Sequence, residues 1–127
     1  MSQTQSPVSP GSTEQVLEVE LNALGQLQNG CAATFVLTNR LGAPIRKVSY
    51  ELAFFNDKNV VDKITTIDFG EIPQDKTRVR KFNLPNVTCA GVKRIVVNDA
   101  PACDGPSARA CLDMLRTRSQ VSVPFEG

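Results

Sequence analysis

The stretch KVSYELAFFNDKNVV, residues 47–61, carries the clearest structural signal in this sequence. Every second residue in its first half is apolar: Val48, Tyr50, Leu52 and Phe54. A period of two is typical of a β-strand with one buried face. The polar tip NDKN, residues 56–59, then indicates a hairpin, and residues 60–69 return as a second strand. The stretch therefore predicts a pair of neighbouring antiparallel strands.

The same alternation extends outward along the chain. Further strands are predicted over residues 16–21, 31–38, 77–84, 92–98 and 120–125. The phase slips between Val79 and Phe82, which predicts a β-bulge near Arg80 and Lys81. One short helical turn is expected within residues 107–115.

These segments predict an all-β, immunoglobulin-like antiparallel two-sheet sandwich of about seven strands. The Cys…Trp…Cys pattern of antibody domains is absent, because the sequence has no tryptophan. The predicted core consists of Phe35, Leu37, Tyr50, Leu52, Ile95, Val97, Val121 and Val123.

The chain has 127 residues, enough for one domain with its own core. Residues 1–13 are rich in Ser, Gln, Thr and Pro, so we expect a flexible N-terminal tail or linker. Residues 14–127 are expected to form a single sandwich domain. No apolar run approaches the roughly 20 residues of a transmembrane helix, so none is expected.

The charge composition argues against several function classes. The net charge is +1, and the sequence contains no histidine, the commonest acid/base residue and metal ligand. We therefore expect no metal, no cofactor and no enzymatic activity. Neither a strong basic field nor an aromatic stacking platform is visible, so we expect no nucleic-acid binding.

Four cysteines remain to be explained. Their spacing is wider than the close pairs that zinc sites use, and no C-x-x-C redox motif is present. Four cysteines allow three disulfide pairings, of which the simplest joins Cys31 to Cys89 and Cys103 to Cys111. Disulfides indicate an oxidising compartment. Free buried thiols in a cytosolic protein are the alternative.

Two groups of residues are candidates for partner contact. The stretch VNDAPACD places Asn98, Asp99 and Asp104 beside the loop CDGPSARAC, residues 103–111, and this stapled surface is our first choice. The same polar residues are also typical of an ordinary turn. The second group is a basic stripe, which could meet an anionic surface or could be a solvated face: Arg78, Arg80, Arg94, Arg116 and Arg118.

The segments TNRLGAPIRKVSYELAFFNDKNVV and DFGEIPQDKTRVRKFNLPNVTCAGVKRIVVNDAPAC resemble a group of small exported bacterial proteins. Proteins of this group are described as Tat-pathway-signal or hypothetical periplasmic proteins and are common in alphaproteobacteria. The resemblance implies a periplasmic or secreted protein whose leader is not part of this chain. It implies no particular activity.

We therefore expect a non-enzymatic exported sandwich that binds another protein in an accessory, assembly or scaffold role. One alternative is a small-ligand or enzyme site near Asp99 and Asp104. The other is a binder of polyanions or of the cell-envelope surface that uses the arginine stripe.

Overall fold

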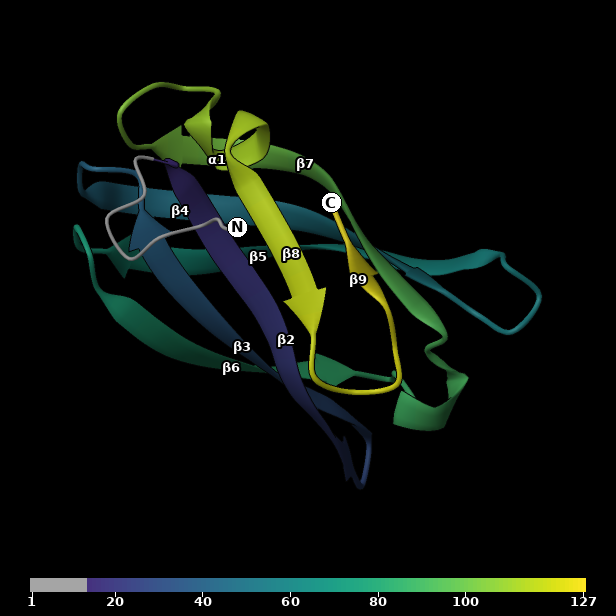
Figure 1. The fold of residues 1–127 in the computed structure, drawn as a ribbon. Helices are drawn as coiled ribbons and strands as arrows, with labels where there is room; N and C mark the ends of the chain where they lie inside the picture. Colours follow the sequence, from purple (N-terminus) through teal and green to yellow (C-terminus); the bar gives the residue numbers. More distant parts are fainter. Residues whose placement is uncertain (1–13) are drawn as a thin grey trace, which may run out of the picture.

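The computed structural model describes residues 14–127 and shows two four-stranded β-sheets packed face to face (Figure 1). The predicted tail, residues 1–13, lies outside the described residues. The first sheet has the order β6-β3-β2-β8, with β2 (Val16–Leu27), β3 (Gly30–Arg40), β6 (Thr77–Pro85) and β8 (Leu115–Ser119). The second has the order β5-β4-β7-β9, with β4 (Ile45–Phe55), β5 (Val61–Ile72), β7 (Arg94–Asp104) and β9 (Phe125–Glu126). The predicted all-β two-sheet sandwich is confirmed.

The chain changes sheets repeatedly, and its C-terminal part contributes to both. Strands β2 and β3 form an antiparallel hairpin, as do β4 and β5. The β2–β8 and β7–β9 ladders run parallel, which the prediction of an antiparallel sandwich does not include. Within residues 14–127, no helix has the length and apolar character needed to cross a membrane.

The first six predicted strands all overlap observed strands, and the short helical turn expected within residues 107–115 is present as α1 (Ala110–Asp113). The prediction missed β8, which begins at Leu115, and placed the seventh strand largely in the wrong position. Of the predicted strand 120–125, only Phe125 belongs to a strand. The Ser119 hydroxyl lies 2.7 Å from the Val123 carbonyl oxygen and donates to it, which curls the chain into a turn.

The predicted bulge near Arg80 and Lys81 is wrong. The β3–β6 ladder continues without a register shift from Gly30 opposite Pro85 to Thr38 opposite Thr77. The misleading residue is Val79, which looks like a core position but is 62% exposed on the outer face. The register shift in this sheet lies instead in β2, between Leu21 and Ala23.

The core lies between the sheets and is centred on aromatic rings. Every predicted core residue is buried except Val121, which is half-buried because it lies in the turn after β8. Phe69 was not among the predicted core residues, yet its ring lies 5.3 Å from that of Phe35 and 5.1 Å from that of Phe82. Edge-to-face contacts of this kind add to the stability gained from apolar burial.

Two buried polar side chains are fully hydrogen-bonded inside this core. The Tyr50 hydroxyl donates to the Cys111 carbonyl oxygen at 2.6 Å, and burial raises the pKa of Tyr50. The Asn39 amide nitrogen donates to the carbonyl oxygens of Ala43 and Ile72, and its oxygen accepts from the Leu41 N–H. Asn39 therefore joins the β3–β4 connection to the end of β5.

Truncating Leu52 to alanine tests the packing of the two sheets. Leu52 is fully buried, so Leu52→Ala is expected to lower the free energy of unfolding by about 2–5 kcal/mol. Val79→Ala serves as the control, because an exposed strand residue should change it by no more than about 0.5 kcal/mol. Urea unfolding followed by circular dichroism measures both. Equal effects of the two changes would contradict the assigned core.

Candidate functional site

On one side of the sandwich, β5 and β6 form the outer strands of the two sheets (Figure 1). Two hollows of about 510 and 360 Å³ lie on this side. The larger is lined by residues 54–55, 62–63, 86–88 and 91–92, and the smaller by Lys63 and residues 65–68 and 82–85. Lys63 lines both hollows, and we call the two together the edge groove.

The edge groove is closed at one end by Arg80. The Arg80 side chain extends from β6 and donates to the carbonyl oxygens of Phe69 and Glu71 on β5, both at 2.9 Å. These two bonds connect the edges of the sheets across the side of the sandwich. Beyond them, towards the start of β5, strand β5 pairs only with β4.

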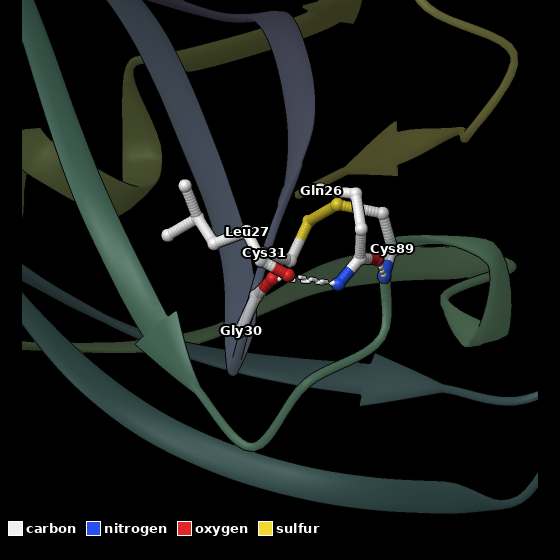
Figure 2. The surroundings of a disulfide bond; sticks show 5 residues. All are labelled: Gln26, Leu27, Gly30, Cys31 and Cys89. Atoms are coloured by element: carbon white, nitrogen blue, oxygen red, sulfur yellow. Dashed lines mark hydrogen bonds between the residues drawn. A yellow bond between two sulfur atoms is a disulfide. The ribbon is translucent and has the colours of Figure 1, made fainter.

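The opposite end of the edge groove is walled by the connection between β6 and β7. This connection includes the short 3-10 helix η1 (Cys89–Gly91), and the Cys31–Cys89 disulfide joins it to β3. Figure 2 shows Gln26 beside this disulfide, accepting a hydrogen bond from the Cys89 N–H and donating to the carbonyl oxygens of Leu27 and Gly30. One disulfide and one hydrogen bond therefore hold Cys89 of the wall to β3 and β2, and two further hydrogen bonds fix the Gln26 side chain.

The close approach of β3 to β6 at this wall requires a glycine. A Cβ atom at Gly30 would lie 2.5 Å from the Leu84 carbonyl oxygen, closer than van der Waals contact allows. Any larger residue would push β6 away from β3. Because residues 82–85 line the smaller hollow, Gly30 also sets the position of that side of the edge groove.

Lys63 is the central charged residue of the edge groove. Its side chain is half-buried and lines both hollows. The neighbouring Asp62 carboxylate is bound instead by the Asn56 amide at 2.9 Å. Among residues 14–127, no carboxylate forms an ion pair with Lys63. The groove therefore presents an ammonium group that a carboxylate ligand could pair with.

Three exposed aliphatic residues lie at the start of β5, on either side in sequence of Asp62 and Lys63, which line the larger hollow. Val60, Val61 and Ile64 are 55%, 41% and 57% exposed, and we call these three residues the apolar rim. Single exposed aliphatic residues are common on protein surfaces, whereas several close together in sequence beside an uncovered strand edge make this end of β5 a candidate contact surface. The sequence predicted a strand over residues 60–69. It did not indicate that the first part of this strand is uncovered.

Both predicted disulfides, Cys31–Cys89 and Cys103–Cys111, are confirmed. The second closes the loop at residues 103–111. The buried Cys111 lies against the core, where its carbonyl oxygen accepts a hydrogen bond from the Tyr50 hydroxyl. Arg109 precedes α1 as its N-cap and makes no side-chain capping hydrogen bond. Met114, at the end of α1, is 41% exposed beside this loop, but neither hollow of the edge groove reaches it.

The predicted polar cluster lies on the outer face of the second sheet, away from the edge groove. Asn98 donates to the Glu51 carboxylate at 2.6 Å, and Asp99 accepts from the adjacent Ala100 N–H. Asp104 lies opposite Lys47 in the β4–β7 ladder. These are local contacts of a strand surface, and none of the three predicted residues lines either hollow.

The structure does not gather the predicted arginines into one stripe. Arg78 and Arg80 lie on β6, whereas Arg116 and Arg118 lie on β8 at the opposite edge of the same sheet. Arg94 lies on β7 in the other sheet, where it binds Glu126 at 2.7 Å and stacks on Phe55. Arg116 and Arg118 pair with Glu14 and Glu20. Most of this positive charge is therefore used within the fold.

Glu20 is the one carboxylate in this network that is largely buried, with 10% of its side chain exposed. It accepts hydrogen bonds from the side chains of Asn22, Arg118 and Gln120. The Asn22 hydrogen bond is the main cause that holds the pKa of Glu20 below its ordinary value of 4.5, and Gln120 and Arg118 add to it against the opposing effect of burial. The hydrogen bonds to Glu20 connect β8 and the residue after it to β2. Neither strand belongs to the sheet that contains β5.

Within the described part of the chain, no three Asp, Glu or Cys side chains are placed together to hold a metal ion. Counting only residues 14–127, the edge groove presents the Lys63 ammonium without an ion pair beside an edge of β5 that no other strand covers.

No protein-family model matches the chain, and comparison with curated proteins and with solved structures finds no significant match. The resemblance to small exported bacterial proteins therefore stays a prediction. The edge groove is the candidate functional site.

Removing each disulfide in turn tests how the wall is held. Each bond joins a fully buried cysteine to a half-buried one, so Cys31→Ala/Cys89→Ala and Cys103→Ala/Cys111→Ala disturb packing to a similar extent. The first bond closes 58 positions and the second 8. Chain entropy then predicts losses of about 4 and about 2–3 kcal/mol in unfolding free energy. A larger loss from the short loop, measured by urea unfolding, would contradict this order.

The Glu20 site predicts a pH-dependent contribution to stability. Because the folded-state pKa lies below 4.5, the unfolded chain takes up the proton first, so the contribution is complete above that pH and is lost as the pH falls through the folded value. Glu20→Gln should therefore cost about 1–3 kcal/mol at neutral pH and much less near about pH 3. Glu18→Gln, on the same strand, is the control and should show a smaller pH dependence. Equal costs of Glu20→Gln at the two pH values would overturn the assignment.

Proposed function

We propose that the protein is an exported, non-enzymatic binding module that holds another protein at the edge groove. The observation that carries this proposal is the exposed start of β5, where the residues of the apolar rim flank in sequence Asp62 and Lys63, which line a hollow of about 510 Å³. Burying an aliphatic side chain of this size contributes about 1.5–3 kcal/mol, so two or three of them supply much of the affinity of a transient complex. The edge groove, rather than the stapled loop at residues 103–111, is therefore the proposed contact surface.

The two disulfides support an oxidising environment outside the cytoplasm. A periplasmic or secreted location agrees with them and with the resemblance to exported bacterial proteins. In such a compartment a rigid sandwich with one uncovered side would serve in an accessory, assembly or scaffold role.

The alternative functions have less support. A polyanion binder needs unpaired cations that lie together, but Arg94, Arg116 and Arg118 are paired with glutamates. A ligand or enzyme site near Asp99 and Asp104 needs a hollow lined by these residues. Both side chains are exposed on a strand of the outer face.

Site-specific crosslinking tests the proposed surface. A photo-crosslinking residue placed at Ile64 should give one defined adduct in the producing organism, and the partner can then be purified. Ile64→Lys should weaken binding of that partner about tenfold or more, because a charged group replaces buried apolar surface. Binding is measured by titration calorimetry with the two purified proteins.

The control is Val79, an exposed aliphatic residue on the other outer strand, with 62% exposure against 57% for Ile64. Val79→Lys should leave the affinity within about twofold of that of the unsubstituted chain. An adduct formed from position 79 or 114 but not from 64 would contradict the proposed surface.

A further inference from the structure

The free edge of β5 is uncovered over only part of its length. Strand β5 pairs with β4 on one side, and Arg80 occupies the other side at Phe69 and Glu71. Residues 61–68 precede this block, and all of them except Val61 and Ile64 line one or both hollows of the edge groove. An uncovered strand edge carries unpaired N–H and C=O groups, and these can accept an additional strand.

The burial pattern of β5 shows which side chains such a strand would meet. Lys63, Thr65 and Ile67 alternate with the exposed residues Asp62, Ile64 and Thr66, so the first three face inward, towards β6. Across the groove, Phe82 and Leu84 of β6 also face inward. The inner side of the groove is thus apolar at one end and carries the Lys63 ammonium at the other.

Three charged groups line the two hollows: Asp62, Lys63 and Asp68. The Asp62 carboxylate accepts from the Asn56 amide, and the Asp68 carboxylate lies 3.6 Å from the Lys47 ammonium. The Arg80 guanidinium is bound by the two β5 carbonyl oxygens, whereas Lys63 has no ion pair among residues 14–127. A half-buried ammonium beside a free strand edge favours a ligand that brings a carboxylate.

We propose that an extended segment of a partner protein adds to the second sheet as a strand alongside residues 61–68 of β5. The segment carries Asp or Glu at an inward position, where it pairs with Lys63. An aliphatic residue at the next inward position enters the hollow of about 360 Å³ near Phe82 and Leu84, and an outward aliphatic residue packs on Ile64. This inference rests on the proposed function and specifies its mode of binding.

The charge pattern also disfavours a second copy of this chain as the added strand. Antiparallel pairing of two β5 edges about a two-fold axis would place Lys63 of both copies in the same inward layer. The inward residues of this segment, Lys63, Thr65 and Ile67, offer no carboxylate to either ammonium. A foreign segment with an acidic residue can pair with the Lys63 ammonium, whereas the β5 edge of a second copy cannot.

Selection from a library of random linear peptides displayed on phage, with the oxidised full chain as bait, tests the chemistry of the segment. The enriched peptides should share alternating aliphatic residues and one Asp or Glu at a fixed place in that alternation. A synthetic peptide of this type should bind at least about tenfold more weakly to Lys63→Glu, and replacing its acidic residue by Lys should restore binding to that variant. Lys81→Glu, on the exposed outer face of β6, makes the same change in net charge and should alter the affinity less than about twofold.

N-methylation of the peptide tests whether it binds as a strand. Alternate amides of an added strand point towards β5, so N-methylating one alternate set should abolish binding and N-methylating the other should not. Tolerance of both sets would overturn strand addition, as would enriched peptides without an acidic residue. A dimer in sedimentation equilibrium that Ile64→Lys disperses would overturn the assignment of a foreign segment.

These outcomes can be told apart from failure of the proposed function. If Ile64→Lys weakens binding of the crosslinked natural partner but the peptide experiments fail, the edge groove binds protein in another way. If Ile64→Lys leaves the natural partner bound, the proposed contact surface itself is wrong, whatever the peptides show.

Discussion

The side-chain amide of Asn39, fully buried at one end of the sandwich, fixes where the two sheets are joined. Its nitrogen donates to Ala43 in the β3–β4 connection and to Ile72 at the end of β5, and its backbone groups bond to Asp75 and Lys76 in the β5–β6 connection. Two of the five crossings between the sheets, β3–β4 and β5–β6, are thereby tied to one residue. A buried amide without these partners would cost about 1–3 kcal/mol for each unsatisfied group, so the crossings have little freedom to separate.

The end of the sandwich that Asn39 holds together explains why the edges of β5 and β6 separate further along. With the connections fixed at Asn39, β5 and β6 start from a common point, and Arg80 bridges them again over Phe69 and Glu71. Beyond Arg80 no backbone ladder joins β5 to β6, because they belong to different sheets. The twist of packed sheets separates their edges with distance from a fixed corner. The edge groove therefore lies where the fold is least constrained by its own hydrogen bonds.

Sequence alternation predicted the parts of the fold that depend on local pattern. The strand at residues 47–54 and the two disulfides were predicted because a period of two and a set of four cysteines leave few alternatives. Strand β8 was missed because in the sequence LRTRS only Leu115 is a large apolar residue and its partner strand, β2, is about a hundred positions earlier. Val79 misled the prediction because apolarity does not reveal exposure at a sheet edge.

The candidate site could not be predicted for a related reason. Lys63 and Ile64 are ordinary strand residues in the sequence, and their importance comes from the distance between two edges that no local pattern encodes. The predicted arginines and the Asn98–Asp99 pair were chosen for their chemistry alone. In the structure Arg94 and Arg118 form ion pairs with Glu126 and Glu20. The Asn98 amide donates a hydrogen bond to the Glu51 carboxylate.

The parallel placement of β8 and β9 has a consequence for the order in which the protein acquires its structure. Residues 115–126 supply an outer strand to the first sheet and then to the second. A chain that is made from its N-terminus therefore cannot complete either sheet until this segment has been added. Until then β2 and β7 each have one side unpaired.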